Sequence, residues 1–330
     1  MKVFISSYPD EEAEAVAERL RELHALSNRV HSLVENPFAA EIILVGSLGN
    51  GKDELHYIDE VLENDLIGRF SKKCFSVSYR DVPIVFNRGI YESGQRNGAR
   101  GVLTLGRVRA GSYGVSGTFN PYAKAHCPSG MDYENKKYLF SFIGRDSSSI
   151  RRKLFCQKFN RDGIVIEDSS DFALWSSRDA DNIDRRQKYY YGTLLHSKFS
   201  LCPRGIGTGS IRLFESMRCG VSPVIISDGW IPPKDRRWGD FSLTIPEKEL
   251  DKLEEIVASH EGRYREMGML ARKVYEECFC ENVYFNYIVK NCLDMMKMQL
   301  IPEAVYWKLR HVIACSLKVK RVALRSVSPN

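Results

Sequence analysis

The segment Ser197–Pro233 has the sequence SKFSLCPRGIGTGSIRLFESMRCGVSPVIISDGWIPP, which predicts a strand, a glycine-rich loop, a helix and a second strand. The apolar run Phe199–Cys202 stops at Pro203, and Pro223–Ser227 is a second short run rich in branched side chains. Short apolar runs of this kind are typical of parallel strands that are buried on both faces. The segment therefore predicts one complete βαβ unit and an α/β fold.

The helix of this unit is marked at both ends. Ser210 stands at the N-cap position, and Gly220 follows the last turn, where a glycine often ends a helix. Between them Ile211, Phe214 and Met217 recur at helical spacing. We therefore expect these three side chains on the buried face of the helix.

The loop Arg204–Gly209 contains three glycines in six residues. Its backbone can approach a ligand closely, and it leads into a helix N-terminus, where unpaired amides and the helix dipole favour negative charge. Arg204 and Arg212 add two positive charges nearby. The loop therefore predicts an anion site that suits a diphosphate.

Glu215 lies three residues after Arg212 and admits two interpretations. An acid beside a phosphate site can accept hydrogen bonds from ribose hydroxyls. Alternatively, the two residues form an i,i+3 surface pair, which contributes only about 0.2–0.5 kcal/mol. The anion-binding loop favours the ribose interpretation.

The run from Pro203 to Pro233 resembles the signature of the exostosin family of glycosyltransferases. In that family a glycine-rich PRG loop, an S-x-R-x-x-E helix and a G-x-x-P-V-I-I-x-D strand follow one another. The resemblance implies a GT-B architecture, with two Rossmann-like domains that face each other across a cleft and the nucleotide sugar bound by the C-terminal one. It also implies inverting transfer from a nucleoside diphosphate donor, with UDP as the expected nucleotide.

The exostosin resemblance extends to a second segment. Phe142–Arg145 and Ile150–Leu154 are similar to the family's F-x-G-R and I-R-x-x-L motifs, which lie on the diphosphate side of the cleft. The predicted donor-binding residues are Arg145, Arg151, Arg204, Gly207, Thr208, Gly209, Ser210, Arg212 and Glu215.

Composition sets broad limits on the class of protein. The 330 residues are 43% hydrophobic and 27% charged, which is typical of a globular chain with room for two domains. The net charge of +6 does not favour nucleic acid as a partner. The sequence has nine cysteines without paired CxxC sets, and its N-terminus does not resemble a signal peptide. Both features predict a reducing, cytoplasmic location. The sequence implies no cofactor. The absence of a membrane anchor points to a bacterial or viral type of exostosin.

We expect three parts along the chain. Residues 1–130 form an acceptor-binding Rossmann-like domain, residues 131–285 form the Rossmann-like domain for the nucleotide sugar, and residues 286–330 are helices that cross back. The first domain is expected to begin with a strand, a long amphipathic helix and a strand, at Val3–Ser6, Glu11–Val34 and Glu41–Val45.

The general base for the transfer must come from the N-terminal half, and two acids are candidates. Asp81 lies in SYRDVPIVF at the end of a predicted strand, where a carboxylate can face a cleft, although it can also be a solvated turn residue. Glu92 in GIYES is the second candidate. Asp81 is the residue predicted to be catalytic.

Two other motifs point to different chemistry and are weaker. Gly46–Asp53, GSLGNGKD, nearly matches a phosphate loop, but Asp53 stands where a Ser or Thr must bind magnesium, so a phosphate-loop kinase is disfavoured. Asp179-Ala180-Asp181 matches the D-x-D of metal-dependent sugar transferases, yet acids before a helix are natural caps. We therefore predict no metal site and metal-independent catalysis.

The C-terminal stretch of residues 304–325, AVYWKLRHVIACSLKVKRVALR, mixes apolar and basic residues and contains no acid. This pattern suits a helix on a membrane surface, and equally a helix docked on the body of the protein.

The sequence thus predicts an inverting hexosyl- or pentosyltransferase that moves a sugar to a hydroxyl of a glycan or lipid-linked glycan in polysaccharide or glycoconjugate synthesis. The alternative is a non-catalytic partner subunit that keeps the donor fold and assists a related enzyme.

Overall fold

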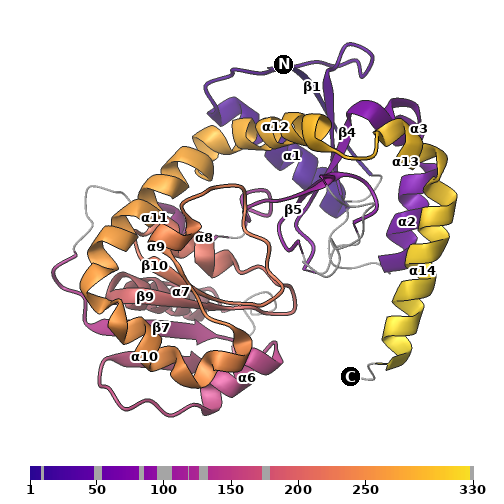
Figure 1. Cartoon of the computed structure of the whole chain (residues 1–330). Helices are drawn as coiled ribbons and strands as arrows, with labels where there is room; N and C mark the ends of the chain where they lie inside the picture. The colour runs from indigo at the N-terminus through magenta and orange to yellow at the C-terminus, as the bar shows by residue number, and fades with distance from the viewer. Residues whose placement is uncertain are drawn as a thin grey trace. The chain divides into compact units, whose positions relative to one another are not determined.

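The structure is a computed structural model that describes residues 1–8, 11–47, 54–81, 85–94, 106–117, 119–125, 133–172 and 179–327. The chain forms two compact units: unit 1 comprises Met1–Gly111 and Tyr284–Asn330, and unit 2 comprises Ser112–Val283. Each unit is a parallel β-sheet with helices packed on it (Figure 1). The α/β class and the two Rossmann-like halves expected of a GT-B protein are confirmed.

The sheet of unit 1 has six parallel strands in the order β2-β1-β3-β4-β5-β6. Because the order reverses between β1 and β3, helices can cover both faces of the sheet. Buried branched and aromatic side chains from these strands form the core. The strands are β1 (Lys2–Ser7), β2 (Ser32–Leu33), β3 (Ile42–Gly46), β4 (Cys74–Ser78), β5 (Gly89–Tyr91) and β6 (Val108–Ala110).

The first helix, α1 (Glu11–Leu26), ends eight residues before the predicted Val34. Ser27 stops it: its amide donates to the carbonyls of Leu23 and His24, both at 3.1 Å, and its hydroxyl also donates to His24. Arg29 then adopts a left-handed φ of 53°, which turns the chain so that β2 can pair with β1. The long-helix prediction was wrong beyond Leu26, because this local turn outweighs the apolar spacing.

The remaining helices of unit 1 come from both ends of its sequence. Asn64 separates α2 from α3, because its side-chain oxygen accepts the Ile67 amide at 3.0 Å and starts a new helix there. Between α3 and β4 lies a 3₁₀ turn, Ser71–Lys73. The α-helices are α2 (Glu54–Glu63), α3 (Asp65–Phe70), α12 (Glu281–Met298), α13 (Glu303–Lys308) and α14 (Arg310–Val327).

The basic C-terminal helix α14 docks on α2 (Figure 1). Ile313 and Ala314 are buried in the core of unit 1, and Leu317 packs against it. Lys318 adds an ion pair with Asp59, with its Nζ 2.5 and 2.7 Å from the two carboxylate oxygens. Of the two interpretations of residues 304–325, the structure shows docking. None of the helices described is both long and apolar enough to cross a bilayer.

A buried ion pair ties α13 to the sheet of unit 1. Arg107 contacts Glu303 through two hydrogen bonds, of 2.6 Å from Nη2 and 3.1 Å from Nε, and the two side chains are only 1% and 3% exposed. The Arg107 guanidinium also lies 3.3 Å from the centroid of the Tyr306 ring and donates to the carbonyl of Phe86 at 3.2 Å. Gln299 donates to the same carboxylate at 2.6 Å. The start of α13 is therefore held by charge and hydrogen bonds as well as by apolar packing.

The sheet of unit 2 has five parallel strands in the order β11-β10-β9-β7-β8, and the βαβ prediction for Ser197–Pro233 is confirmed. Gly220 ends the helix with φ 64°, as expected, whereas Leu213 takes the place of Ile211 on its buried face. The strands are β7 (Tyr138–Gly144), β8 (Ile164–Asp168), β9 (Ser197–Pro203), β10 (Ser222–Ile226) and β11 (Leu243–Thr244).

Unit 2 begins at Ser112, earlier than the predicted boundary at residue 130. The reason is that α5, which precedes residue 130, packs on α7 and α8 of unit 2. The helices of unit 2 are α5 (Pro121–Ala125), α6 (Ser149–Cys156), α7 (Ala180–Leu195), α8 (Ile211–Arg218), α9 (Trp238–Phe241), α10 (Leu253–Ser259) and α11 (Tyr264–Cys278), with 3₁₀ turns at Glu247–Lys252 and Glu261–Arg263.

Candidate functional site

The strand order of unit 2 reverses between β7 and β9, and in open α/β sheets ligands bind at the carboxyl ends of the strands beside such a point. Two loops leave the sheet here: one follows Gly144 and leads into α6, and the other follows Pro203 and leads into α8. The predicted donor residues lie on these loops and on the first turns of the two helices, except Glu215, which lies in the second turn of α8. The topology therefore brings them to one edge of the sheet.

The glycine loop is fixed by the neighbouring strands. The amide of Arg204 donates to the carbonyl of Ile226 at 3.0 Å, and the Ser227 hydroxyl donates to the carbonyl of Thr208 at 3.0 Å. From the other side, the Ser148 hydroxyl donates to the carbonyl of Arg204 at 2.9 Å. A loop held at both ends has little conformational entropy to lose when a ligand binds.

Arg151 positions both loops. Its guanidinium donates to the carbonyls of Arg145 at 3.2 Å, Pro203 at 3.2 Å and Arg204 at 3.1 Å. A Cβ at Gly205 would lie 3.3 Å from its Nη2 atom, so the glycine permits this close approach. Arg151 thus links the carboxyl ends of β7 and β9. Because its guanidinium is bonded to the backbone carbonyls of both loops, its positive charge acts on a ligand across the loop backbone.

Arg212, on the first turn of α8, is only partly accessible. Its Nη2 atom donates to the carbonyl of Ile143, and its guanidinium carbon lies 4.4 Å from the ring centroid of Phe142 and 5.3 Å from that of Tyr190. A Cβ at Gly144 would come within 3.1 Å of Nη2. Its Nε–H is buried and has no hydrogen-bond partner among the residues described. Arg212 therefore places positive charge directly beneath the β7 loop.

Arg204 makes an ion pair that the sequence did not signal. Its Nε and Nη2 atoms donate to the two carboxylate oxygens of Glu247 at 2.6 and 3.1 Å. Glu247 follows β11, and its amide in turn donates to Asp228 at 3.0 Å. While this pair is closed, Glu247 neutralises the charge of Arg204 and occupies its Nε and Nη2 donors.

Arg145 is the accessible cation of the site. Its side chain is exposed, and within the described part of the chain its guanidinium has no hydrogen bond or ion pair. Of the first amides of α8, that of Leu213 donates to the carbonyl of Ser210 at 3.2 Å, whereas those of Ile211 and Arg212 precede the first bonds within the helix, and the Ser210 hydroxyl does not cap them. Arg145 and these amides are the groups best placed to meet an anion.

Glu215 is buried, with only 4% of its surface exposed. One carboxylate oxygen accepts the amide of Asn120 at 2.7 Å, and the other accepts the hydroxyl of Tyr190 at 2.7 Å. Burial raises the pKa of Glu215, while these two hydrogen bonds and the nearby Arg212 act in the opposite direction. Neither sequence interpretation anticipated that Glu215 fastens α5 and α7 to α8.

The two candidate bases both follow strands of unit 1 at the carboxyl edge of its sheet. Asp81 comes three residues after β4 and is partly exposed. Glu92 comes directly after β5, is 1% exposed, and its amide donates to the carbonyl of Ser78 at 3.0 Å. Asp81 is thus the more accessible of the two carboxylates.

The structure tests one of the two weaker motifs, Asp179-Ala180-Asp181, and leaves most of the other, Gly46–Asp53, undescribed. Asp179 caps α7, because its carboxylate accepts the amide of Asn182 at 3.0 Å, which confirms the cap interpretation of the D-x-D. The part of the phosphate-loop motif after Ser47 lies outside the described residues.

Residues 115–260 match the model of the Exostosin GT47 domain. This segment contains all five strands of unit 2, both loops and the ion pair of Arg204. The chain carries an exostosin GT47 domain. The family resemblance inferred from Pro203–Pro233 is thereby confirmed.

Relatives of the exostosin domain occur in animals and plants. The chain is 33% identical over 156 residues to the Exostosin-1 homolog of Caenorhabditis elegans, an alignment that covers 43% of this chain and 40% of the relative. It is 40% identical over 90 residues to the probable glucuronoxylan glucuronosyltransferase IRX7 of Arabidopsis thaliana, covering 26% of this chain and 20% of the relative. The matched region thus spans less than half the length of these curated relatives.

A solved structure, Anabaena Alr3699/HepE in complex with UDP, aligns with 89% of this chain and 99% of its own. The TM-score is 0.41 and the sequence identity is 9%, a likeness too low to establish a shared fold or ligand.

In the exostosin domain, replacing Glu215 by Ala is expected to lower the free energy of unfolding of unit 2 by about 1–3 kcal/mol for each buried donor left unpaired. The two donors are the Asn120 amide and the Tyr190 hydroxyl. Urea unfolding measures the loss. Tyr190→Phe is the control: it removes one donor together with its bond and should cost less than Glu215→Ala, and an equal cost would contradict the assignment.

Proposed function

We propose that this protein is an inverting glycosyltransferase that moves a sugar from a nucleoside diphosphate donor, with UDP as the expected nucleotide, to a hydroxyl of a glycan or lipid-linked glycan. The glycosyltransferase family of the matched domain supports transfer as the class of reaction. The single observation that carries the donor assignment is the fixed glycine loop at the β7/β9 reversal, which leads into the N-terminus of α8.

The chemistry needs stabilisation of the departing diphosphate, and the loops can provide it. Arg145, together with the amides of Gly207, Thr208, Gly209 and Ser210 and the first turn of α8, would bind the phosphates. Arg151 and Arg212 would add positive charge from behind the backbone, and Arg204 would join them when its bonds to Glu247 open. Glu215 would act mainly by holding α8 in place, with any ribose contact through its remaining lone pairs.

The function is tested by incubating the purified full chain with a panel of nucleoside diphosphate sugars and measuring release of the nucleotide. We expect slow hydrolysis of one donor, unchanged by a chelator because guanidiniums and amides supply the positive charge. A ligand at a hundred times its dissociation constant should also stabilise the fold by about 2.7 kcal/mol. Stabilisation without turnover would favour the non-catalytic partner subunit. If no donor were hydrolysed and none stabilised the fold, the proposal would be contradicted.

Arg145→Ala is expected to weaken donor binding by about 10- to 100-fold, the value of a charge-assisted hydrogen bond to phosphate. Stability should not change, because the side chain is exposed. The matched control is Arg152→Ala, which removes a neighbouring arginine that is 69% exposed and paired with Asp146. Calorimetry with UDP compares the two. Equal affinities in both variants would contradict the role of Arg145.

Contact of residues 304–325 with a membrane surface stays a prediction. The side chains of Ile313, Ala314 and Leu317 pack on the core of unit 1. Val312 and Val319, each 70% exposed, are among the apolar side chains of this stretch that lie at the surface in the part whose side chains are described.

A further inference from the structure

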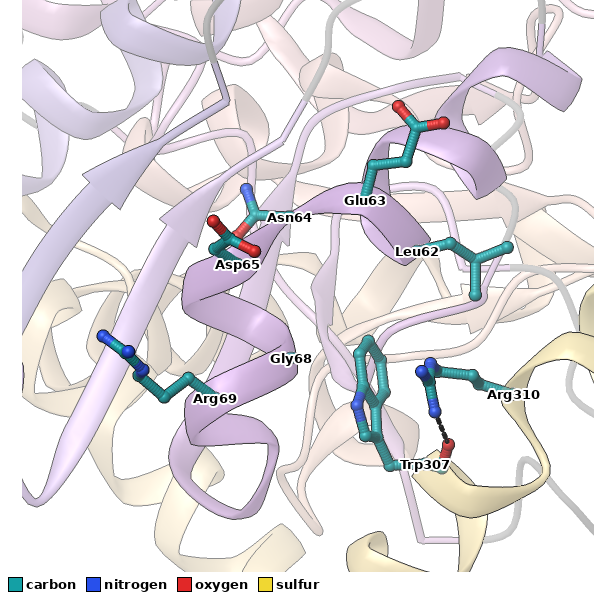
Figure 2. Close-up of a pocket in the computed structure, with 8 residues that line it drawn as sticks. All are labelled: Leu62, Glu63, Asn64, Asp65, Gly68, Arg69, Trp307 and Arg310. Atoms are coloured by element: carbon teal, nitrogen blue, oxygen red, sulfur yellow. Dashed lines mark hydrogen bonds between the residues drawn. The ribbon is translucent and has the colours of Figure 1, made fainter.

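Unit 1 has a pocket of about 480 Å³ between the start of α3 and the end of α13 (Figure 2). This volume lies within the range of small-molecule sites. The pocket involves none of the candidate donor residues. It is lined by Leu62, Glu63, Asn64, Asp65, Gly68, Arg69, Trp307 and Arg310.

The indole of Trp307 is a fixed platform in this pocket. It stands between α3 and Arg310, whose guanidinium carbon lies 5.2 Å from the ring centroid and whose Nη1 donates to the Trp307 carbonyl at 3.0 Å (Figure 2). The residue before it, Tyr306, is buried and donates to the carbonyl of Phe86 at 3.0 Å. Contacts of Tyr306, before Trp307 in the chain, and of Arg310, after it, therefore hold the indole in place.

The polar groups around the indole are of both kinds. Glu63 and Asp65 supply acceptors. The Nε–H of Arg310 is buried and lacks a hydrogen-bond partner among the described residues. The side-chain oxygen of Asn64 caps α3, which leaves the NH₂ group of Asn64 as a donor. With two carboxylates and two guanidiniums, the lining has no net charge.

Gly68 lines the pocket beside the indole. It is an exposed residue of α3, where glycine costs about 1 kcal/mol relative to alanine. No positive φ requires it, and a Cβ would meet only the Cζ2 atom of Trp307, at an ordinary 3.9 Å. Neither a positive φ nor close packing requires the glycine, so a larger side chain at this position would extend into the pocket that Gly68 lines.

We propose that this pocket binds a neutral saccharide ring. The C–H face of a pyranose would pack on the indole, and its hydroxyls, which both donate and accept, would match the mixed lining. A phosphate or sulfate would meet two carboxylates, and a metal ion would meet two guanidiniums. The site belongs to unit 1 alone, so it stands whether or not unit 2 binds a nucleotide sugar.

The test is a printed array of neutral and sulfated oligosaccharides, probed with the full chain without any nucleotide, followed by calorimetry with the best neutral ligand. Gly68→Leu is the decisive variant, because it fills the pocket and replaces glycine by a better helix former. Gly192→Leu is its matched control: Gly192 is also a helical glycine, and a Cβ there would meet nothing within 4 Å.

We expect the wild type and Gly192→Leu to bind alike, and Gly68→Leu to lose at least tenfold in affinity while its thermal stability is kept. Trp307→Ala should also lose binding, with Trp307→Phe between the two. Three results would overturn the proposal: no neutral oligosaccharide bound by the wild type, only sulfated ones bound, or unchanged binding by Gly68→Leu. Donor hydrolysis should be the same in Gly68→Leu and wild type, which separates this site from the proposed reaction.

Discussion

Replacing Asp81 by Asn is expected to reduce sugar transfer by about 10² to 10⁴-fold, the usual cost of removing a positioned general base. The substitution keeps the size of the side chain and removes its ability to take a proton from the acceptor hydroxyl. Binding of UDP should not change, because the proposed donor residues all lie in unit 2. The measurement is kcat/KM with donor and acceptor, together with the dissociation constant of UDP.

Glu92→Gln is the comparison variant, which shows whether the general base is Asp81 or Glu92. Glu92 follows the next strand of the same sheet but is 1% exposed, whereas Asp81 is partly exposed and can be reached by an acceptor. If Asp81→Asn transfers sugar at nearly the wild-type rate and Glu92→Gln does not, the base is Glu92. Near-normal transfer by both variants would remove both acids from the mechanism and leave the donor site untouched.

The second large effect concerns the stability of unit 1. Glu303→Ala is expected to lower its free energy of unfolding by about 3–5 kcal/mol, because the charge of Arg107, 1% exposed, would be left inside without its partner. The double variant Arg107→Met/Glu303→Leu should lose less than Glu303→Ala, since it removes the stranded charge as well as the bond.

Hydrogen exchange can locate this loss within the chain. We expect protection to fall in β4, β5 and α13 of unit 1, while the strands of unit 2 exchange as in the wild type. Glu22→Ala is the control, because it breaks the Arg19–Glu22 pair, in which Glu22 is 62% exposed, and should cost less than about 1 kcal/mol. If Glu303→Ala costs no more than this control, the buried pair does not hold α13.

The central βαβ unit could be predicted because each of its signals is local. Apolar runs, the N-cap position of Ser210 and the glycine at 220 determine strand, helix and end within a few residues of sequence. The buried face of the helix differs from the prediction at one position, because the packing of Leu213 in place of Ile211 depends on the elements beneath the helix.

The parts that could not be predicted depend on residues far apart in the chain. The Arg107–Glu303 pair spans 196 residues, and the partner of Arg204 lies 43 residues away. Nothing near Glu247 or Glu303 in the sequence marks either as a partner, because the sheet topology alone brings them to these arginines. For the same reason, Glu215 could be read as a ligand residue, although Asn120 and Tyr190 occupy its oxygens in the fold.

The division of unit 1 into two sequence segments has a consequence for synthesis on the ribosome. The whole of unit 2 lies between Gly111 and Tyr284, so its sequence is complete once Val283 has been translated, whereas the unit that is begun first is completed last. At about 5–20 residues per second, the remaining segment 284–330 takes on the order of 2–9 s to translate. During that interval Arg107 has no Glu303 to pair with. The core of unit 1 also lacks Tyr306, Ile313 and Ala314 and is exposed to water on that side. A nascent chain paused there is the form of this protein on which we expect a chaperone to act.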